Sequence, residues 1–205
     1  MTKAIGIVLF PEAEELDFVG PFEVFTMYAQ YFDKDRRVLT VAETDEPVIG
    51  AKGLVVVPEA TFESCPPLDV LLVPGGQGTL REMENETMLD FIRRAGGAAQ
   101  WVTSVCTGAF VLSRAGYLAG RRATTHWAAL AQLREEQDVT VVEERFVRDG
   151  NVITAAGVSA GIDMALYLVG ELSSPETARN VQKFIEYYPQ PPYAEATAVA
   201  GKDSL

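Results

Sequence analysis

The chain has 205 residues, of which 48% are hydrophobic and 22% charged, the balance of a globular protein with one sizeable core. Its formal net charge of −12 would repel phosphate backbones, which argues against nucleic acid as a partner. The two cysteines, Cys65 and Cys106, are too few for a disulfide framework, so we expect a reduced, cytoplasmic protein. The first apolar run is short and acids follow it, which predicts neither a signal peptide nor a membrane span.

The first half of the chain alternates apolar runs with helical patterns. A continuous apolar run over Ala4–Phe10 is typical of a strand buried on both faces of a parallel sheet. Leu16-Asp17 stands at the junction between the following loop and a helix, in which Pro21 fits the first turn. A further helix is expected over Thr79–Ala95, closed by Gly96-Gly97. Other strands are expected at Arg37–Ala42, between Glu46 and Pro58 as a short pair around Gly50–Gly53, at Asp69–Val73 and at Trp101–Val105.

The second half continues the alternation. Helices are expected over Thr107–Ala115, Thr125–Gln137 and Ser159–Leu172, and Ser174-Pro175 predicts the start of a last helix that runs to about Tyr188. Strands over Thr140–Val147 and Asn151–Ala155 form a predicted hairpin across Asp149-Gly150-Asn151. The pattern predicts one α/β sandwich domain over residues 1–188 with a mostly parallel sheet, and a tail over residues 189–205.

Cys106 is the first candidate for chemistry. It follows a predicted strand and precedes a helix that opens at Gly108, so its thiol would lie at the carboxyl edge of the sheet, where α/β sites form. The helix N-terminus there would favour the thiolate and make Cys106 a nucleophile. The alternative is a buried structural thiol, since free cysteine is among the most buried residue types.

Asp17 is the second candidate, with two roles left open. It can be the N-cap of the helix that begins at Phe18, or its carboxyl group can lie beside Cys106 and move the thiol proton. The fallback acids are Glu14, Glu15 and Glu23. His126, the single histidine, is more simply a structural residue at the start of a helix, which leaves an acid as the partner of the sulfur.

The remaining candidates surround the same edge of the sheet. Pro74-Gly75-Gly76 follows a central strand, and it is either a tight turn or a source of free N–H donors for charge near the sulfur. Thr107 directly follows Cys106, and Cys65 is expected to be an incidental loop thiol. The sequence contains no P-loop, no GxGxxG motif and no metal-ligand cluster, so we expect no cofactor and no metal.

Four segments together carry a resemblance to a known family. They are AIGIVLFPEAEELDFVGPFEVF, DVLLVPGG, VTSVCTGAFVLSRAGYLAGRRATTHW and GVSAGIDMALYLV, and they resemble the ThiJ/PfpI superfamily, most closely its isonitrile hydratase branch. The ligand-sensing domains of AraC-type regulators share much of the pattern, but the sequence ends before a helix-turn-helix region would be expected.

The resemblance implies a flavodoxin-like three-layer sandwich with a cysteine nucleophile elbow, in a homodimer. It implies that Cys106 adds to the terminal carbon of an isonitrile, and that the resulting thioimidate is hydrolysed to an N-substituted formamide without a cofactor. Asp17 would move protons, Thr107 matches the residue after the nucleophile, and N–H groups of Gly75, Gly76 and Thr107 would stabilise charge. Threonine at position 107, where protease-like members carry histidine, argues against peptidase activity. The alternatives are a glyoxalase- or deglycase-like enzyme using Cys106, and a small-molecule or oxidation sensor.

Overall fold

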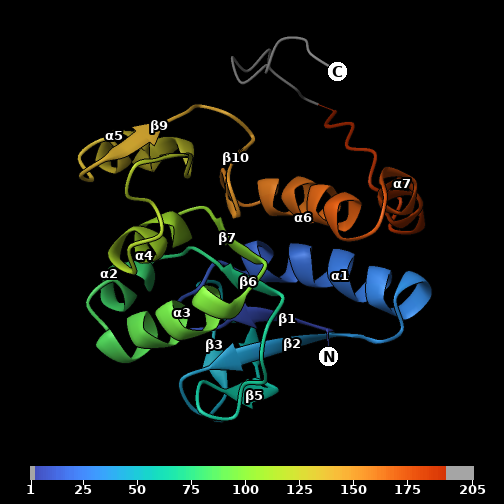
Figure 1. Ribbon diagram of the computed structural model, residues 1–205, viewed down its shortest axis with the longest axis horizontal. Coiled ribbons are helices and arrows are strands. Elements are labelled where there is room, and N and C mark those ends of the chain that lie inside the picture. Colours follow the sequence, from blue (N-terminus) through green and yellow to red (C-terminus); the bar gives the residue numbers. More distant parts are fainter. Residues whose placement is uncertain (1–2, 193–205) are drawn as a thin grey trace.

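A seven-stranded sheet with helices on both faces forms the centre of the protein (Figure 1). The computed structural model describes residues 3–192. The strand order is β10-β11-β7-β6-β1-β2-β5; all neighbours are parallel except β10, which is antiparallel to β11. The strands are β1 (Lys3–Val8), β2 (Arg36–Ala42), β5 (Ala60–Thr61), β6 (Val70–Val73), β7 (Trp101–Val105), β10 (Phe146–Asp149) and β11 (Val152–Ala155).

Two groups of helices cover the two faces of this sheet. One face carries α1 (Glu15–Phe32), α6 (Ala160–Leu172) and α7 (Pro175–Phe184), and the other carries α2 (Thr79–Glu82), α3 (Glu86–Ala98) and α4 (Gly108–Arg114). The predicted α/β three-layer sandwich is confirmed. None of the helices within residues 3–192 is long and apolar enough to cross a bilayer.

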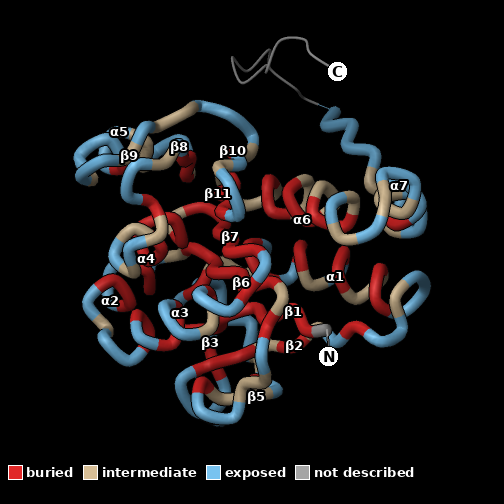
Figure 2. Tube along the Cα trace, in the orientation of Figure 1, coloured by how far each residue is buried: buried red, intermediate tan, exposed pale blue. Residues whose placement is uncertain are grey.

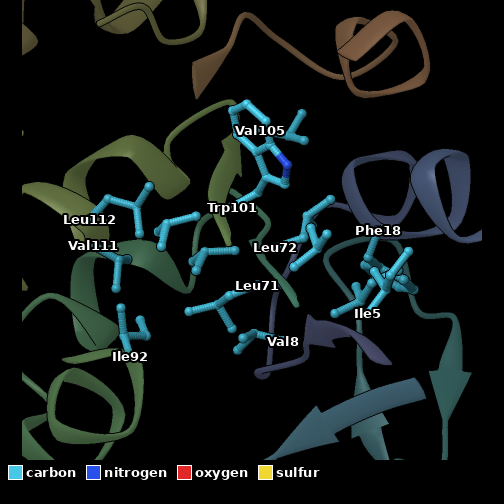
Figure 3. Packing of buried hydrophobic residues seen from close by; sticks show 14 of the residues in the cluster. Ile5, Val8, Phe18, Leu71, Leu72, Ile92, Trp101, Val105, Val111 and Leu112 are labelled. Carbon is cyan, nitrogen blue, oxygen red and sulfur yellow. The ribbon is translucent and has the colours of Figure 1, made fainter. Parts of the chain in front are cut away.

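The strands at the middle of the sheet are buried because both faces are covered. Every residue of β6 and β7 is buried, as predicted for both strands (Figure 2). Figure 3 shows the apolar side chains on the two sides: Ile5 and Phe18 lie together near α1, and Ile92, Val111 and Leu112 gather near α3 and α4. This packing fixes the ends of β6 and β7 relative to the start of α1.

Two small two-stranded sheets lie outside the main sheet. A hairpin of β3 (Val48–Ile49) and β4 (Val55–Val56) follows β2, as predicted around Gly50–Gly53. Between α4 and β10 lie a two-stranded parallel sheet and two short helical turns: β8 (Arg121–Ala123), η1 (Trp127–Ala129), α5 (Leu130–Leu133) and β9 (Val139–Val141).

Two predicted helices are wrong in their extent. The segment Thr79–Ala95 forms two helices, because the Asn85 side chain accepts a hydrogen bond from Met88 N at 3.3 Å and caps a new start. Gly96 and Gly97 lie inside α3 rather than closing it. The expected helix over Thr125–Gln137 is reduced to η1 and α5.

The later elements are mostly as predicted. The β10–β11 hairpin is confirmed, although the β9 part of the expected strand from Thr140 pairs with β8 instead. Ser174 caps α7 by accepting from Thr177 N at 3.1 Å, but this helix ends at Phe184 rather than near Tyr188. The predicted tail begins at residue 189, and its residues 193–205 lie outside the described part of the chain.

Candidate active site

The turn between β7 and α4 holds Cys106 in a strained conformation. Its φ is +56°, a left-handed value that costs a non-glycine residue about 1–3 kcal/mol and persists only where the surroundings enforce it. Its N–H donates to Ala155 O at 3.1 Å and Ala156 O at 2.9 Å, and its carbonyl accepts from Thr125 Oγ1 at 2.8 Å. The turn thus fixes the thiol at the carboxyl edge of the sheet, as the predicted elbow requires.

The loop after β6 approaches this turn so closely that a side chain would not fit. A Cβ on Gly75 would lie 2.6 Å from Thr107 N and 2.8 Å from Cys106 Cβ. Gly75 N donates to Asp17 Oδ2 at 2.8 Å, and Gly76 N donates to Thr107 Oγ1 at 3.0 Å. The expectation that these two glycines offer free donors to the reacting centre is therefore corrected: their N–H groups hold the side chains of Asp17 and Thr107.

Asp17 lies beside Cys106, in the first turn of α1. The helix begins at Glu15 and its cap position is Glu14, so Asp17 is not the N-cap. Its side chain is fully buried, and Oδ1 has no hydrogen-bond partner among the described residues. Burial raises the pKa of Asp17 to about 7, and the Glu14 charge acts in the same direction, against the opposing effects of Gly75 N–H, Lys52 and the Cys106 thiol.

The Cys106 thiol is also shifted away from ionisation. Burial and the neighbouring Asp17 carboxylate raise its pKa to about 12, although donors from Thr107 and Val158 lower it. Desolvation and a like charge thus oppose the effect of the helix N-terminus, which favours the thiolate. At neutral pH the stable form is a thiol beside a carboxyl group that titrates near pH 7.

Three donors face the sulfur, and sequence reasoning found only those of Thr107. The Thr107 N–H and hydroxyl act on the Cys106 sulfur, and so does the Val158 N–H. Val158 has a φ of +49°, which a β-branched residue rarely adopts, so its residue type gave no sign of this role. The Thr107 hydroxyl also lies 2.9 Å from Thr79 Oγ1, which links α2 to the elbow.

A cavity of about 750 Å³ opens onto Cys106 and Thr107. Such a volume is typical of a small-molecule site. One part of its lining is apolar, from Leu80, Met83, Phe110 and Val158, and another is charged, from Glu12, Glu14 and Lys52.

His126 lines this cavity, which sequence reasoning did not predict. It does begin a short helical turn as expected, because its Nδ1 accepts from Ala128 N at 3.3 Å. Its ring also packs against Gly157, where a Cβ would lie 2.1 Å from Cδ2. His126 and Cys106 thus line the same cavity.

The fallback acids have other partners or positions. Glu14 lines the cavity and pairs with Lys52. Glu15 Oε1 accepts from Lys52 N at 2.6 Å and so ties the β3–β4 hairpin to α1, whereas Glu23 is exposed.

Cys65 is half-buried in its loop, where its thiol donates to Pro66 O at 3.4 Å. Within residues 3–192 no three His, Cys, Asp or Glu side chains gather as a metal site would require.

Comparison with known proteins identifies the family of this chain. The sequence matches the DJ-1/PfpI family over residues 3–171. The chain belongs to this family. Among its DJ-1/PfpI relatives, isonitrile hydratase of Pseudomonas putida is 46% identical over 193 residues, which cover 94% of this chain and 82% of that protein.

Two further relatives agree with the fold and the resemblance. A ThiJ/PfpI family protein from Pseudomonas syringae has a crystal structure that superposes with a TM-score of 0.87 at 37% identity, covering 94% of this chain and 78% of that one. The HTH-type transcriptional regulator CdhR of Pseudomonas aeruginosa is 28% identical over 89% of this chain, which spans 54% of the regulator. The predicted ThiJ/PfpI resemblance is confirmed.

Proposed function

We propose that this protein is an isonitrile hydratase that converts R–N≡C to the N-substituted formamide through a thioimidate on Cys106. One observation carries the proposal: the buried Asp17 carboxyl group, held by Gly75 N–H, lies beside a thiol on a strained elbow that faces a small-molecule cavity. The 46% identity to an isonitrile hydratase supports the same reaction.

In the first step Cys106 adds to the terminal carbon of the isonitrile. The thiol proton passes to Asp17 as the sulfur–carbon bond forms, and Asp17 then gives that proton to the same carbon. The product is the thioimidate R–N=CH–S–Cys106, formed without net gain or loss of a proton. The Thr107 and Val158 N–H groups stabilise the negative charge that develops on sulfur.

In the second step water adds to the thioimidate carbon. The Asp17 carboxylate takes a proton from the water as the water oxygen bonds to the thioimidate carbon. Asp17 then gives this proton to the substrate nitrogen, which produces R–NH–CH(OH)–S–Cys106 and restores the carboxylate. The carbon–sulfur bond then breaks, the hydroxyl proton returns to the sulfur through Asp17, and R–NH–CHO leaves. Water is consumed and the Cys106 thiol is restored, so the cycle needs no oxidant or reductant.

The thiol chemistry favours this reaction over an oxidation sensor. Oxidation of cysteine proceeds through the thiolate, and the raised pKa of Cys106 keeps the resting thiol protonated. An addition that starts from a thiol and a nearby carboxylate uses that resting state directly.

We also propose that the protein acts in the cytoplasm as a homodimer. A reducing compartment keeps Cys106 in the thiol form that the first step uses. The β3–β4 hairpin exposes Ile49, Val55 and Val57, an apolar surface suited to a second copy of the chain.

The test is hydration of phenyl isonitrile by purified protein, with the N-formyl product followed by mass spectrometry. Wild type should form N-phenylformamide, and Cys106→Ala should lose at least roughly 1,000-fold of kcat. Cys65→Ala, which removes the other thiol, is the matched control and should keep full activity. Turnover by Cys106→Ala would contradict the mechanism, and wild-type turnover of methylglyoxal alone would favour the glyoxalase-like alternative.

A further inference from the structure

Leu80 lines the active-site cavity while 69% of its surface is exposed. A leucine in that position loses contact with water only when something apolar covers it, and that burial is favourable. Met83 and Phe110 line the same cavity and are themselves buried. We call Leu80, Met83 and Phe110 the apolar wall of the cavity, and Leu80 is its solvent-exposed member.

The one-turn helix α2 holds Leu80 at a fixed position relative to the nucleophile. Thr79 Oγ1 lies 2.9 Å from Thr107 Oγ1, next to Cys106 in sequence. Gly78 N donates to Glu12 O at 3.3 Å, and the Arg81 guanidinium donates to Pro11 O at 2.8 Å. These bonds tie α2 to both the elbow and the loop after β1, so the distance between the apolar wall and the sulfur is set by the fold.

The charged part of the cavity offers nothing to an anionic substrate. The Lys52 ammonium, the one cation in the described lining, pairs with Glu14. Glu12 pairs with Arg81 at 3.5 Å and adds a second carboxylate. The lining therefore holds two carboxylates and one ammonium, and the ammonium is already paired, so an anionic group on the substrate finds no free cation among these three side chains.

From these observations we propose that Leu80, with Met83 and Phe110, forms the subsite that recognises the R group of the isonitrile. The inference rests on the proposed hydratase reaction and names its substrate class: isonitriles whose R group is uncharged, apolar and about the size of a ring. The cavity of about 750 Å³ is far larger than the isonitrile carbon and nitrogen require, which leaves room for such a group.

The experiment compares kcat and KM for phenyl isonitrile and methyl isonitrile. In Leu80→Ser, kcat/KM for phenyl isonitrile should fall roughly tenfold, mainly through KM, while methyl isonitrile changes less than about twofold. Leu80→Met, which keeps an apolar side chain, should retain the preference for the phenyl substrate. Tyr31→Ser, an exposed aromatic at the other end of α1, is the control and should leave both substrates unchanged.

A second pair of probes tests the charge requirement. Ethyl isocyanoacetate should be hydrated at least roughly tenfold more efficiently than the isocyanoacetate anion, because the anion meets the carboxylates. Equal efficiency for this pair, or equal losses for phenyl and methyl isonitrile in Leu80→Ser, would overturn the subsite. If wild type hydrates none of these compounds, the hydratase proposal itself fails, and this outcome is distinct from an active enzyme with unchanged selectivity.

Discussion

Cys106 and Asp17 share one buried environment, in which the Asp17 charge makes the thiol harder to ionise while the thiol hydrogen bond favours the Asp17 carboxylate. The pKa of Asp17 rises to about 7 and that of Cys106 to about 12, in both cases chiefly because burial disfavours the charged form. In the proposed reaction the Cys106 nucleophile is therefore not a resting thiolate. It forms when the thiol proton moves to the Asp17 carboxylate during attack, so this mechanism requires Asp17 to be ionised first.

This requirement predicts the pH dependence of the hydration rate. Because Asp17 must be a carboxylate to accept the thiol proton, kcat/KM for phenyl isonitrile should rise with pH through about 7 and remain high at pH 9. Asp17→Asn should lose roughly 100- to 1,000-fold of kcat and the rise near pH 7, while staying folded by circular dichroism. Glu14→Gln should move the rise to lower pH, since the Glu14 charge raises the pKa of Asp17. A rate that falls through pH 7 in wild type would show that the protonated acid is the active form.

At the scale of secondary structure, the buried parallel strands were the most predictable elements. The apolar runs over β1 and β6 are continuous because helices cover both faces of the sheet, and β7 was predicted from its β-forming residues. Strands β5 and β8 have two and three residues, too few for a periodic pattern, and both were missed. A local cap divided the helix predicted over Thr79–Ala95, because the Asn85 side chain accepts from Met88 N and separates α2 from α3.

The site was predictable where residue type carries the chemistry and unpredictable where only the backbone does. Cys106, Asp17 and Thr107 were found from their types and positions at strand ends, and the structure brings all three together. The N–H of Val158 was not found, because any non-proline residue can donate it. For the same reason the sequence could not tell whether the N–H groups of Gly75 and Gly76 face the substrate or hold neighbouring side chains.

The contact between the Gly75 loop and the elbow predicts a strong effect of one methyl group. In Gly75→Ala the new Cβ would lie 2.6 Å from Thr107 N, so the loop must move and Asp17 loses the Gly75 N–H bond. We expect kcat to fall at least roughly 100-fold and the free energy of unfolding to fall by about 1–3 kcal/mol, measured by urea denaturation. Gly97→Ala is the matched control, because it lies in α3 where a Cβ meets no atom within 4 Å, and it should stabilise slightly. Full activity in Gly75→Ala would show that the close approach does not position the reacting groups.

For the molecule as a whole, the β3–β4 hairpin connects the active site to an exposed apolar surface. Glu15 Oε1 accepts from Lys52 N at 2.6 Å, and Ala51 N donates to Ala13 O at 2.9 Å, so the hairpin turn is fixed beside the start of α1. The turn lines the cavity through Ala51 and Lys52. Val55 in β4 and Val57 directly after it are 58% and 66% exposed, so a partner that covers them would contact the same hairpin whose turn lines the cavity.

The proposed homodimer therefore predicts that charge on this hairpin changes the assembly. Wild type should sediment at twice the 22.3 kDa mass of one chain, and Val57→Glu should sediment as a single chain, because a buried unpaired carboxylate opposes association. Tyr31→Glu places the same charge on an exposed aromatic at the far end of α1 and should remain dimeric. Since the hairpin turn lines the cavity, we expect Val57→Glu also to raise KM for phenyl isonitrile severalfold. Sedimentation of wild type at 22.3 kDa at micromolar concentration would contradict the dimer, and an unchanged KM in a single-chain Val57→Glu would show that the cavity forms without a partner.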